Sequence, residues 1–273
     1  MHRDASRAFF IGVAAYVAVA CSGRFVPVDN AADASTPIVS DGAPPAPDTV
    51  PSLDAGDATK PGVGCASAPA GAFCVDFEAP GSLEKPLWTS VEGIGTGNRV
   101  ILTTGNVFSG QHAATFEKDG QEACTFLRLV RSFPGRHTSF SARADVYTES
   151  NGYFLSIYSM VAANLSYNFL VRSTENEVFL TVQKYDGSSF STAVEKAIPL
   201  DQKGYRQWLT IGIDFSRSGT LPEAIFSVGG KRELVALPSD FGVRDPSLRI
   251  GPYCVGSPTR LTVDNVFFDG KLE

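Results

Sequence analysis

Residues 165–185 read LSYNFLVRSTENEVFLTVQKY, and the order of their side chains predicts the fold class. In the segments 165–173 and 177–185, apolar and polar side chains alternate with a period of two. Successive side chains of a β-strand point to opposite faces, so this period is typical of a strand with one buried face. The pattern therefore predicts two strands, whose apolar faces carry Leu165, Tyr167, Phe169, Val171, Val178, Leu180 and Val182.

Short β-rich runs continue on both sides of these two strands. They cover residues 72–78, 99–103, 112–117, 123–132, 137–147, 153–161, 206–215, 223–228, 232–237, 247–253 and 260–268. Asp-Gly or Gly-Gly pairs at 119–120, 186–187 and 229–230 separate neighbouring runs, as two-residue hairpin turns require. Many antiparallel strands at this spacing, without long helical patterns, predict an all-β sandwich or barrel.

All of these runs lie within residues 65–273, which are enough for one domain with a sizeable core. The preceding segment, 21–64, has a different composition. From Ser22 to Gly64 it holds seven of the chain's 17 prolines and six aspartates. Such a segment buries too little apolar surface to offset the entropy of ordering it. We expect a disordered, extended linker that holds the domain away from its anchor.

The first 20 residues have the layout of a secretory signal. Arg3 and Arg7 give a basic start, an apolar run follows, and small residues precede Cys21. A cysteine at this place resembles the signal of bacterial lipoproteins. The resemblance implies that residues 1–20 are removed and that Cys21 is lipidated; an ordinary cleaved signal and an uncleaved anchor are the alternatives. The apolar run is shorter than the ~20 residues that a membrane-spanning helix needs.

The residue after Cys21 bears on location. In the lipoprotein family an Asp at this position commonly signals retention in the inner membrane, and this chain has Ser22. The resemblance therefore implies a lipid-anchored protein of the outer membrane, facing the periplasm or the cell surface. Two lipid signals already suffice for stable anchoring, and the lipidated cysteine carries several acyl chains. The expected partner of the N-terminus is the membrane.

Several motifs of the 65–273 domain resemble those of concanavalin A-like (laminin-G-like) jelly rolls. They are FCVDFE at 73–78, LW at 87–88, SGQHAATF at 109–116, QWLTI at 207–211, VGGK at 228–231 and VDNV at 263–266. The resemblance implies a jelly-roll sandwich of two antiparallel sheets, one of them concave. Members of this fold include lectins, glycan-binding modules, glycosidases and polysaccharide lyases, so the fold does not select a function.

The same resemblance implies one metal site. Many glycan-binding jelly rolls hold a structural calcium ion between their first and last strands. Glu78 and Asp264 lie at the matching ends of this chain. Since calcium takes carboxylate and carbonyl oxygens, we expect a calcium ion at Glu78 and Asp264. The alternative is that both acids cap turns or face solvent.

The cysteine count fits an exported protein. Apart from Cys21, the chain has Cys65, Cys74, Cys124 and Cys254. An even number in an oxidising compartment indicates two disulfides, for which three connectivities exist. Cys65 and Cys74 are close in sequence at the entry to the domain, so we expect them to pair, which leaves Cys124 with Cys254. The cysteine spacing does not suit a zinc site, and only two histidines lie outside the signal segment.

Signals of catalysis are weak. Glu117, Asp119 and Glu122 have the E-x-D-x-x-E spacing that resembles retaining jelly-roll glucanases, whose two carboxylates flank the scissile bond. Here Lys, Gly and Gln separate the acids, which favours a solvated turn. A polysaccharide lyase needs a base and a group that neutralises the substrate carboxylate, and Tyr158 with Arg143 offers both. No Gly-x-Ser-x-Gly elbow of a serine hydrolase occurs.

Four side chains on polar strand faces suit sugar recognition: Arg143, Tyr158, Asn168 and Gln183. Planar hydrogen-bonding groups pair with hydroxyls, and an aromatic ring covers the C–H face of a sugar. The net charge of −6 lacks the basic excess that nucleic-acid binding needs. We therefore expect a non-catalytic domain that binds a polysaccharide or a protein ligand through this face. For the function of the domain, the alternatives are a carbohydrate-active enzyme and a structural envelope protein. For the face that carries the four residues, the alternative is an ordinary solvated surface.

Overall fold

The computed structural model describes residues 65, 68–95, 97–119, 126–217, 221–253 and 258–273. The predicted signal and linker, with Cys21, lie outside the described residues, as do Cys124 and Cys254. The described part of the chain is built of strands, and it contains no helix of the length and apolarity that crossing a bilayer would take.

The strands form two antiparallel layers, which we call sheet I and sheet II. Sheet I consists of β2 (Ser90–Glu92), β5 (Arg128–Ser132), β7 (Gly152–Ala162), β8 (Leu165–Ser173), β9 (Glu177–Tyr185), β10 (Phe190–Pro199) and β14 (Val243–Tyr253). Sheet II consists of β1 (Phe73–Val75), β3 (Arg99–Thr103), β4 (Ala113–Lys118), β6 (Arg136–Thr148), β11 (Trp208–Ser216), β12 (Glu223–Val228), β13 (Lys231–Ala236) and β15 (Thr259–Leu272). The order in sheet I is β10-β9-β8-β7-β14-β5-β2, and in sheet II it is β13-β12-β11-β6-β15, with β4 and β1 on the far side of β15 and β3 on β4.

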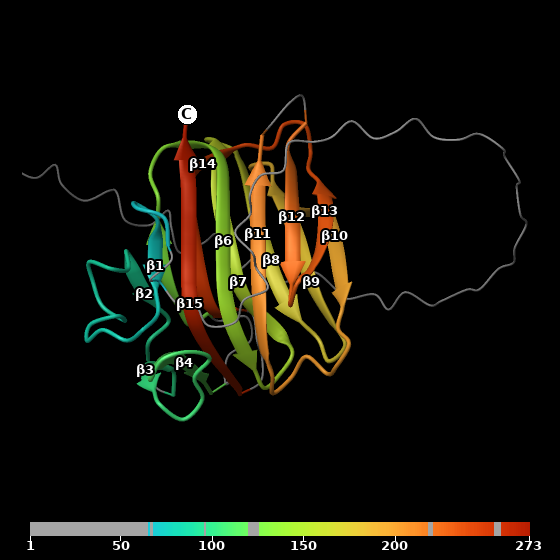
Figure 1. Cartoon of the computed structure of the whole chain (residues 1–273). Helices are drawn as coiled ribbons and strands as arrows, with labels where there is room; N and C mark the ends of the chain where they lie inside the picture. The colour runs from blue at the N-terminus through green and yellow to red at the C-terminus, as the bar shows by residue number, and fades with distance from the viewer. Residues whose placement is uncertain (1–64, 66–67, 96, 120–125, 218–220, 254–257) are drawn as a thin grey trace, which may run out of the picture. The chain divides into compact units, whose positions relative to one another are not determined.

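The two sheets are continuous at one corner. There β14 leaves its partners β7 and β5 and pairs with β6 only at Val243–His137 and Arg244–Arg136. Figure 1 shows β6, β11, β12 and β15 as the layer nearer the viewer, with β7, β8 and β9 behind it. The molecule is therefore the two-sheet antiparallel jelly-roll sandwich that the sequence predicted.

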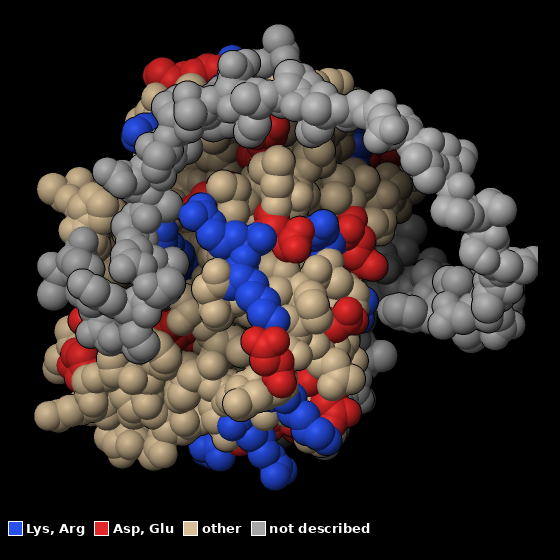
Figure 2. Space-filling model, turned by 45° about the vertical axis from the view of Figure 1, so that its right-hand side comes forward, with Lys and Arg blue, Asp and Glu red and all other residues tan. Residues whose placement is uncertain are grey.

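At the opposite edge, β10 of sheet I lies close to β13 of sheet II. Lys196 pairs with Glu233 at 2.9 Å, and Lys231 pairs with Asp201 at 2.7 Å. Figure 2, which turns this side forward, shows basic and acidic side chains interleaved there. Exposed pairs of this kind contribute little stability, typically about 0–1 kcal/mol each. They show where β10 and β13 approach each other, but they add little to the stability of that edge.

The core fills the space between the sheets. Phe140 of β6 and Phe169 of β8 meet edge to face, with their ring centroids 6.0 Å apart. Phe241, in the loop before β14, is fully buried and contacts both Phe169 of sheet I and Phe215 of sheet II. Aromatic packing across the layers supplies the hydrophobic burial that stabilises such sandwiches.

The two strands that the alternation predicted first are observed as β8 and β9, with the predicted bounds. Two strands were missed. β2 is only three residues long, and β10, with the sequence FSTAVEKAIP, is a largely exposed edge strand without clean alternation. An edge strand has one hydrogen-bonded neighbour and little burial, so its sequence carries a weaker pattern.

The three predicted hairpins have different outcomes. Gly229-Gly230 is a two-residue hairpin turn, because Val228 pairs directly with Lys231. The loop at Asp186 is longer than predicted: β9 ends at Tyr185 and β10 begins at Phe190. The hairpin at 119–120 was wrong, because β4 belongs to sheet II and β5 to sheet I.

The disulfide Cys65–Cys74 is present, as predicted. Cys74 lies on β1 and pairs opposite Phe267 of β15. The disulfide therefore fastens Cys65, at the entry of the domain, to β1, and β1 in turn pairs with the last strand, β15. The second predicted pair, Cys124–Cys254, stays a prediction.

Candidate functional site

Three of the four expected ligand-binding residues form one row across sheet I. Tyr158 of β7 lies opposite Asn168 of β8, and Asn168 lies opposite Gln183 of β9. Directly opposite residues share a face of a sheet. Their neighbours Ile157 and Phe169 point into the core and are fully buried, so the row lies on the outer face of sheet I.

Arg143 does not join this row. It lies on β6, opposite Gly212 of β11, on the outer face of sheet II. The whole core separates it from Tyr158, so the expected four-residue site was wrong for Arg143, and so was the expected pairing of Tyr158 with Arg143 in a lyase. Alternation along a strand assigns each residue to a face of its own sheet, but it does not say which sheet the strand joins.

Other arginines surround the row, and sequence reasoning missed them. Arg249 of β14 lies opposite Ser156, and Arg172 of β8 lies opposite Tyr153, both on the outer face of sheet I. The guanidinium carbon of Arg249 is 4.6 Å from the centroid of the Tyr158 ring. A cation over an aromatic face is attracted by the quadrupole of the ring. The signal was available in the strand 247–253, where the alternation places Arg249 on the polar face.

The environment of Arg249 is unusual for a cation. Burial, and to a smaller extent the positive charge of nearby Arg128, lower the pKa of Arg249 to about 10. Arg128 itself is largely buried and donates from Nε to Oε2 of Glu92 at 2.7 Å. Burying two neighbouring cations is unfavourable unless negative groups compensate them, and Glu92 is one carboxylate for two arginines.

A small hollow lies at this end of the face. Its lining residues are Arg128, Tyr153, Phe154, Leu155, Ser156, Leu170, Arg249, Gly251 and Tyr253. A bulge in β14 between Ile250 and Tyr253 shapes it. At Gly251 the backbone has φ +133°, and a Cβ atom would lie 2.1 Å from the carbonyl oxygen of Leu127. Glycine is therefore required here, and the bulge brings Tyr253 opposite Tyr153 at 6.2 Å between ring centroids.

Two buried polar atoms on this face lack a hydrogen-bond partner among the described residues. They are Oδ1 of Asn168 and Nε of Arg172. Most buried polar atoms in native proteins have a partner, so such exceptions call for an explanation. One is an acceptor and the other a donor, and both are buried beneath the surface of this face.

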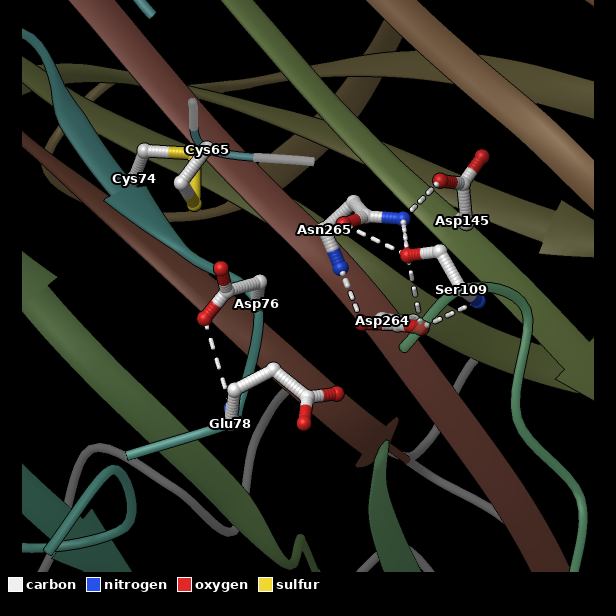
Figure 3. Close-up of a disulfide and its surroundings, with 8 residues drawn as sticks. All are labelled: Cys65, Cys74, Asp76, Glu78, Ser109, Asp145, Asp264 and Asn265. Atoms are coloured by element: carbon white, nitrogen blue, oxygen red, sulfur yellow. Dashed lines mark hydrogen bonds between the residues drawn. A yellow bond between two sulfur atoms is a disulfide. The ribbon is translucent and has the colours of Figure 1, made fainter. Parts of the chain in front are cut away.

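A second polar cluster lies on the other side of the sandwich, on sheet II. Oδ2 of Asp264 accepts from the backbone N–H of Ser109 at 3.0 Å, and Oδ1 accepts from the N–H of Asn265 at 2.8 Å. The Asn265 amide donates to Ser109 Oγ and to Asp145 Oδ2, each at 2.9 Å. Figure 3 shows this network beside the Cys65–Cys74 disulfide.

Burial of the two aspartates of this cluster disfavours their charged form. Burial raises the pKa of Asp264 to about 6, with smaller contributions from the negative charges of Asp145 and Glu78. Burial also raises the pKa of Asp145. Neither aspartate forms an ion pair within the described residues.

Glu78, the other expected calcium ligand, approaches this cluster from the end of β1. Its Oε1 accepts from the N–H groups of Gln111 and His112 at 2.7 and 2.9 Å, and these bonds lower its pKa. The described residues contain no group of three or more His, Cys, Asp or Glu side chains arranged to hold a metal. Carboxylate oxygens are the ligands that calcium prefers, so Glu78 and Asp264 stay the pair expected to hold it. The calcium site stays a prediction.

The acids of the glucanase-like spacing do not form a cleft within the described residues. Glu117 of β4 pairs with Arg99 at 2.6 Å and lies 3.8 Å from Arg260. Glu122 lies outside the described residues. Two arginines hold Glu117 in a surface ion-pair cluster, which is a structural role.

Comparisons with known proteins agree with the fold. No family model matches the chain, and no curated protein matches it. Among solved structures, the Cellulose induced protein Cip1 is 12% identical, with a TM-score of 0.52 over 72% of this chain and 96% of Cip1. Alginate lyase A1-II', of polysaccharide lyase family-7, is 10% identical, with a TM-score of 0.48 over 63% of this chain and 84% of the lyase. The likeness to Cip1 shows the jelly-roll fold alone.

Proposed function

We propose that the jelly-roll domain binds a polysaccharide, without cleaving it, on the outer face of sheet I. The observation that carries the proposal is the row of Tyr158, Asn168 and Gln183 on three neighbouring strands. An aromatic ring beside two amides supplies the stacking surface and the hydroxyl partners that sugars need.

The test is binding of the purified full-length protein to an array of polysaccharides. We expect Tyr158→Ala to weaken binding about tenfold or more, as truncation of a central aromatic contact does. The matched control is Tyr147→Ala, which removes a partly exposed tyrosine from the outer face of sheet II. Equal binding by both variants at unchanged melting temperature, or no binding by the wild type, would overturn the proposal.

A polysaccharide lyase is the second candidate. It is favoured by Arg249, which lies against the Tyr158 ring and also lines the hollow together with Tyr253. In such a reaction a tyrosine takes the proton beside the sugar carboxylate, the C4–O bond breaks, and its electron pair leaves with the departing oxygen, which is then protonated. An arginine would stabilise the negative charge that develops on the carboxylate. Formation of an unsaturated sugar product, seen by its ultraviolet absorbance, would favour this function over simple binding.

We further propose that Cys21 anchors the domain to the outer membrane by its lipid. The support is the sequence: basic start, short apolar run, small residues and cysteine. We expect Cys21→Ser to release the protein from membranes or to block its processing, as cell fractionation would show. Wild-type protein that is wholly soluble would contradict the anchor.

A further inference from the structure

We propose that the ligand of sheet I is an anionic polysaccharide whose carboxylate or sulfate groups pair with Arg172 and Arg249. The proposal rests on the proposed function and specifies its ligand class. It starts from the charges on this face, because the row of Tyr158, Asn168 and Gln183 by itself would suit a neutral glycan equally well.

Two of the three arginines on this face have no carboxylate partner among the described residues. Glu92 pairs with Arg128, and Glu195 of β10 accepts a hydrogen bond from Thr181 at 3.1 Å. Neither Arg172 nor Arg249 forms an ion pair within the described part of the chain. Both instead lie against aromatic rings, Arg249 on Tyr158 and Arg172 on Phe179.

The donors of these two arginines are poorly satisfied. Nε of Arg249 donates to Ser247 Oγ at 3.1 Å, whereas its terminal amino groups make no hydrogen bond to a described residue. Nε of Arg172 is buried without a partner among the described residues. The planar fork of a guanidinium matches a carboxylate or a sulfate, so an anion would satisfy the donors and offset the burial of the charge.

The spacing of the arginines indicates a polymer. Arg249 lies on β14 and Arg172 on β8, with β7 between them. Neighbouring strands are ~4.8 Å apart, so the two backbones are separated by roughly 10 Å. The two guanidinium groups lie over different rings, Arg249 over Tyr158 and Arg172 over Phe179. A chain with repeated anionic groups can pair with both arginines where they lie, and Tyr158 on the intervening strand would support its sugar rings.

The test compares one polymer in two forms: a polyuronate and the same polyuronate with its carboxyl groups reduced to alcohols. A sulfated polysaccharide forms a third arm. The full-length protein, Arg172→Gln, Arg249→Gln and Arg249→Lys are compared by equilibrium binding, and melting temperatures verify folding. Arg143→Gln is the matched control, because it removes an arginine from the outer face of the other sheet.

We expect wild-type protein to bind the polyuronate or the sulfated polymer at least tenfold more tightly than the reduced polymer, with affinity falling as salt rises. Arg172→Gln and Arg249→Gln should abolish most of that preference. Arg249→Lys should restore part of it, and Arg143→Gln should leave it intact. If Arg249→Gln does not fold, the binding preference of Arg172→Gln for the charged over the reduced polymer is the deciding measurement.

The outcomes separate the two claims. Equal binding of the charged and reduced polymers, unaffected by the arginine variants, would overturn the anionic ligand and leave polysaccharide binding standing. Absence of binding to every polymer would overturn the proposed function and this inference together. Preference for the sulfated polymer over the polyuronate would support the inference and identify sulfate as the charged group.

Discussion

Two buried ionisable residues lie on opposite faces of the sandwich, and their environments shift both toward the neutral form. Arg249 is a cation on sheet I whose pKa is lowered, and Asp264 is an acid on sheet II whose pKa is raised. In each case burial is the first cause and a like charge adds to it. A ligand of opposite charge would relieve either one, which is why both residues appear at candidate binding sites.

The pH dependence of stability should report on Asp264. Its pKa is about 6 in the folded protein against 3.8 for the model acid, so the folded state holds a proton that the unfolded state has lost. The contribution of Asp264 is therefore fully present below about pH 4 and is lost as the pH rises through about 6, at most about 3 kcal/mol. We expect the difference in unfolding free energy between wild type and Asp264→Asn, measured without divalent ions, to fall over this range.

The same two proteins, wild type and Asp264→Asn, can also be compared with and without calcium. If the ion binds at Glu78 and Asp264, it should raise the melting temperature of the wild type at pH 7 and have a smaller effect on Asp264→Asn. An equal calcium effect on both proteins would place any calcium site elsewhere. A flat difference between pH 4 and 7 would contradict the raised pKa itself.

At the level of secondary-structure elements, the bulge in β14 decides the shape of the hollow. It occurs where Gly251 passes close to Leu127, and it turns Tyr253 to the side of Tyr153. In a regular strand Arg249 and Tyr253, four residues apart, would already share a face. The bulge therefore sets which residue of β7 lies opposite Tyr253, namely Tyr153.

Substitution of that glycine should therefore cost much more than substitution of a turn glycine. Gly251→Ala combines positive φ with a Cβ atom 2.1 Å from a backbone oxygen, whereas Gly229 has φ +55° and nothing within 4 Å of an added Cβ. We expect Gly229→Ala to lower the unfolding free energy by about 1 kcal/mol, the cost of a left-handed residue, and Gly251→Ala to lower it by considerably more. Chemical denaturation measures both, and equal losses would mean that β14 relaxes without strain.

At the level of the whole molecule, one loop residue helps to hold the two sheets together. Phe241 contacts Tyr167 and Phe169 of sheet I and Phe215 of sheet II. Asp240 beside it accepts from the Tyr167 hydroxyl at 2.6 Å, which fixes the loop to β8. The loop before β14 therefore closes one end of the core.

Truncation of this side chain should destabilise the domain strongly. We expect Phe241→Ala to lower the unfolding free energy by about 3–5 kcal/mol, because it leaves a cavity between the layers. Leu234→Ala on β13 is the control, since Leu234 is 60% exposed and should change stability by less than about 0.5 kcal/mol. Similar losses for both variants would show that Phe241 does not join the sheets.

Local patterns in the sequence were sufficient for the fold class, the bounds of β8 and β9, the faces of their side chains and the Cys65–Cys74 disulfide. Each of these depends on residues near one another in the chain: a period of two within a strand, a turn pair, or two cysteines nine residues apart. The polar row of Tyr158, Asn168 and Gln183 could be proposed for the same reason, because its strands follow one another directly.

Only the tertiary structure decided which sheet each strand joins. It placed Arg143 on sheet II, separated β4 from β5, and brought Arg249 of β14 against Tyr158 of β7. β14 reaches β7 from about 90 residues further along the chain, and its register is set by the packing of the whole core and by the bulge at Gly251. No local period encodes such a pairing, because the free energy that selects it comes from burial between the two sheets.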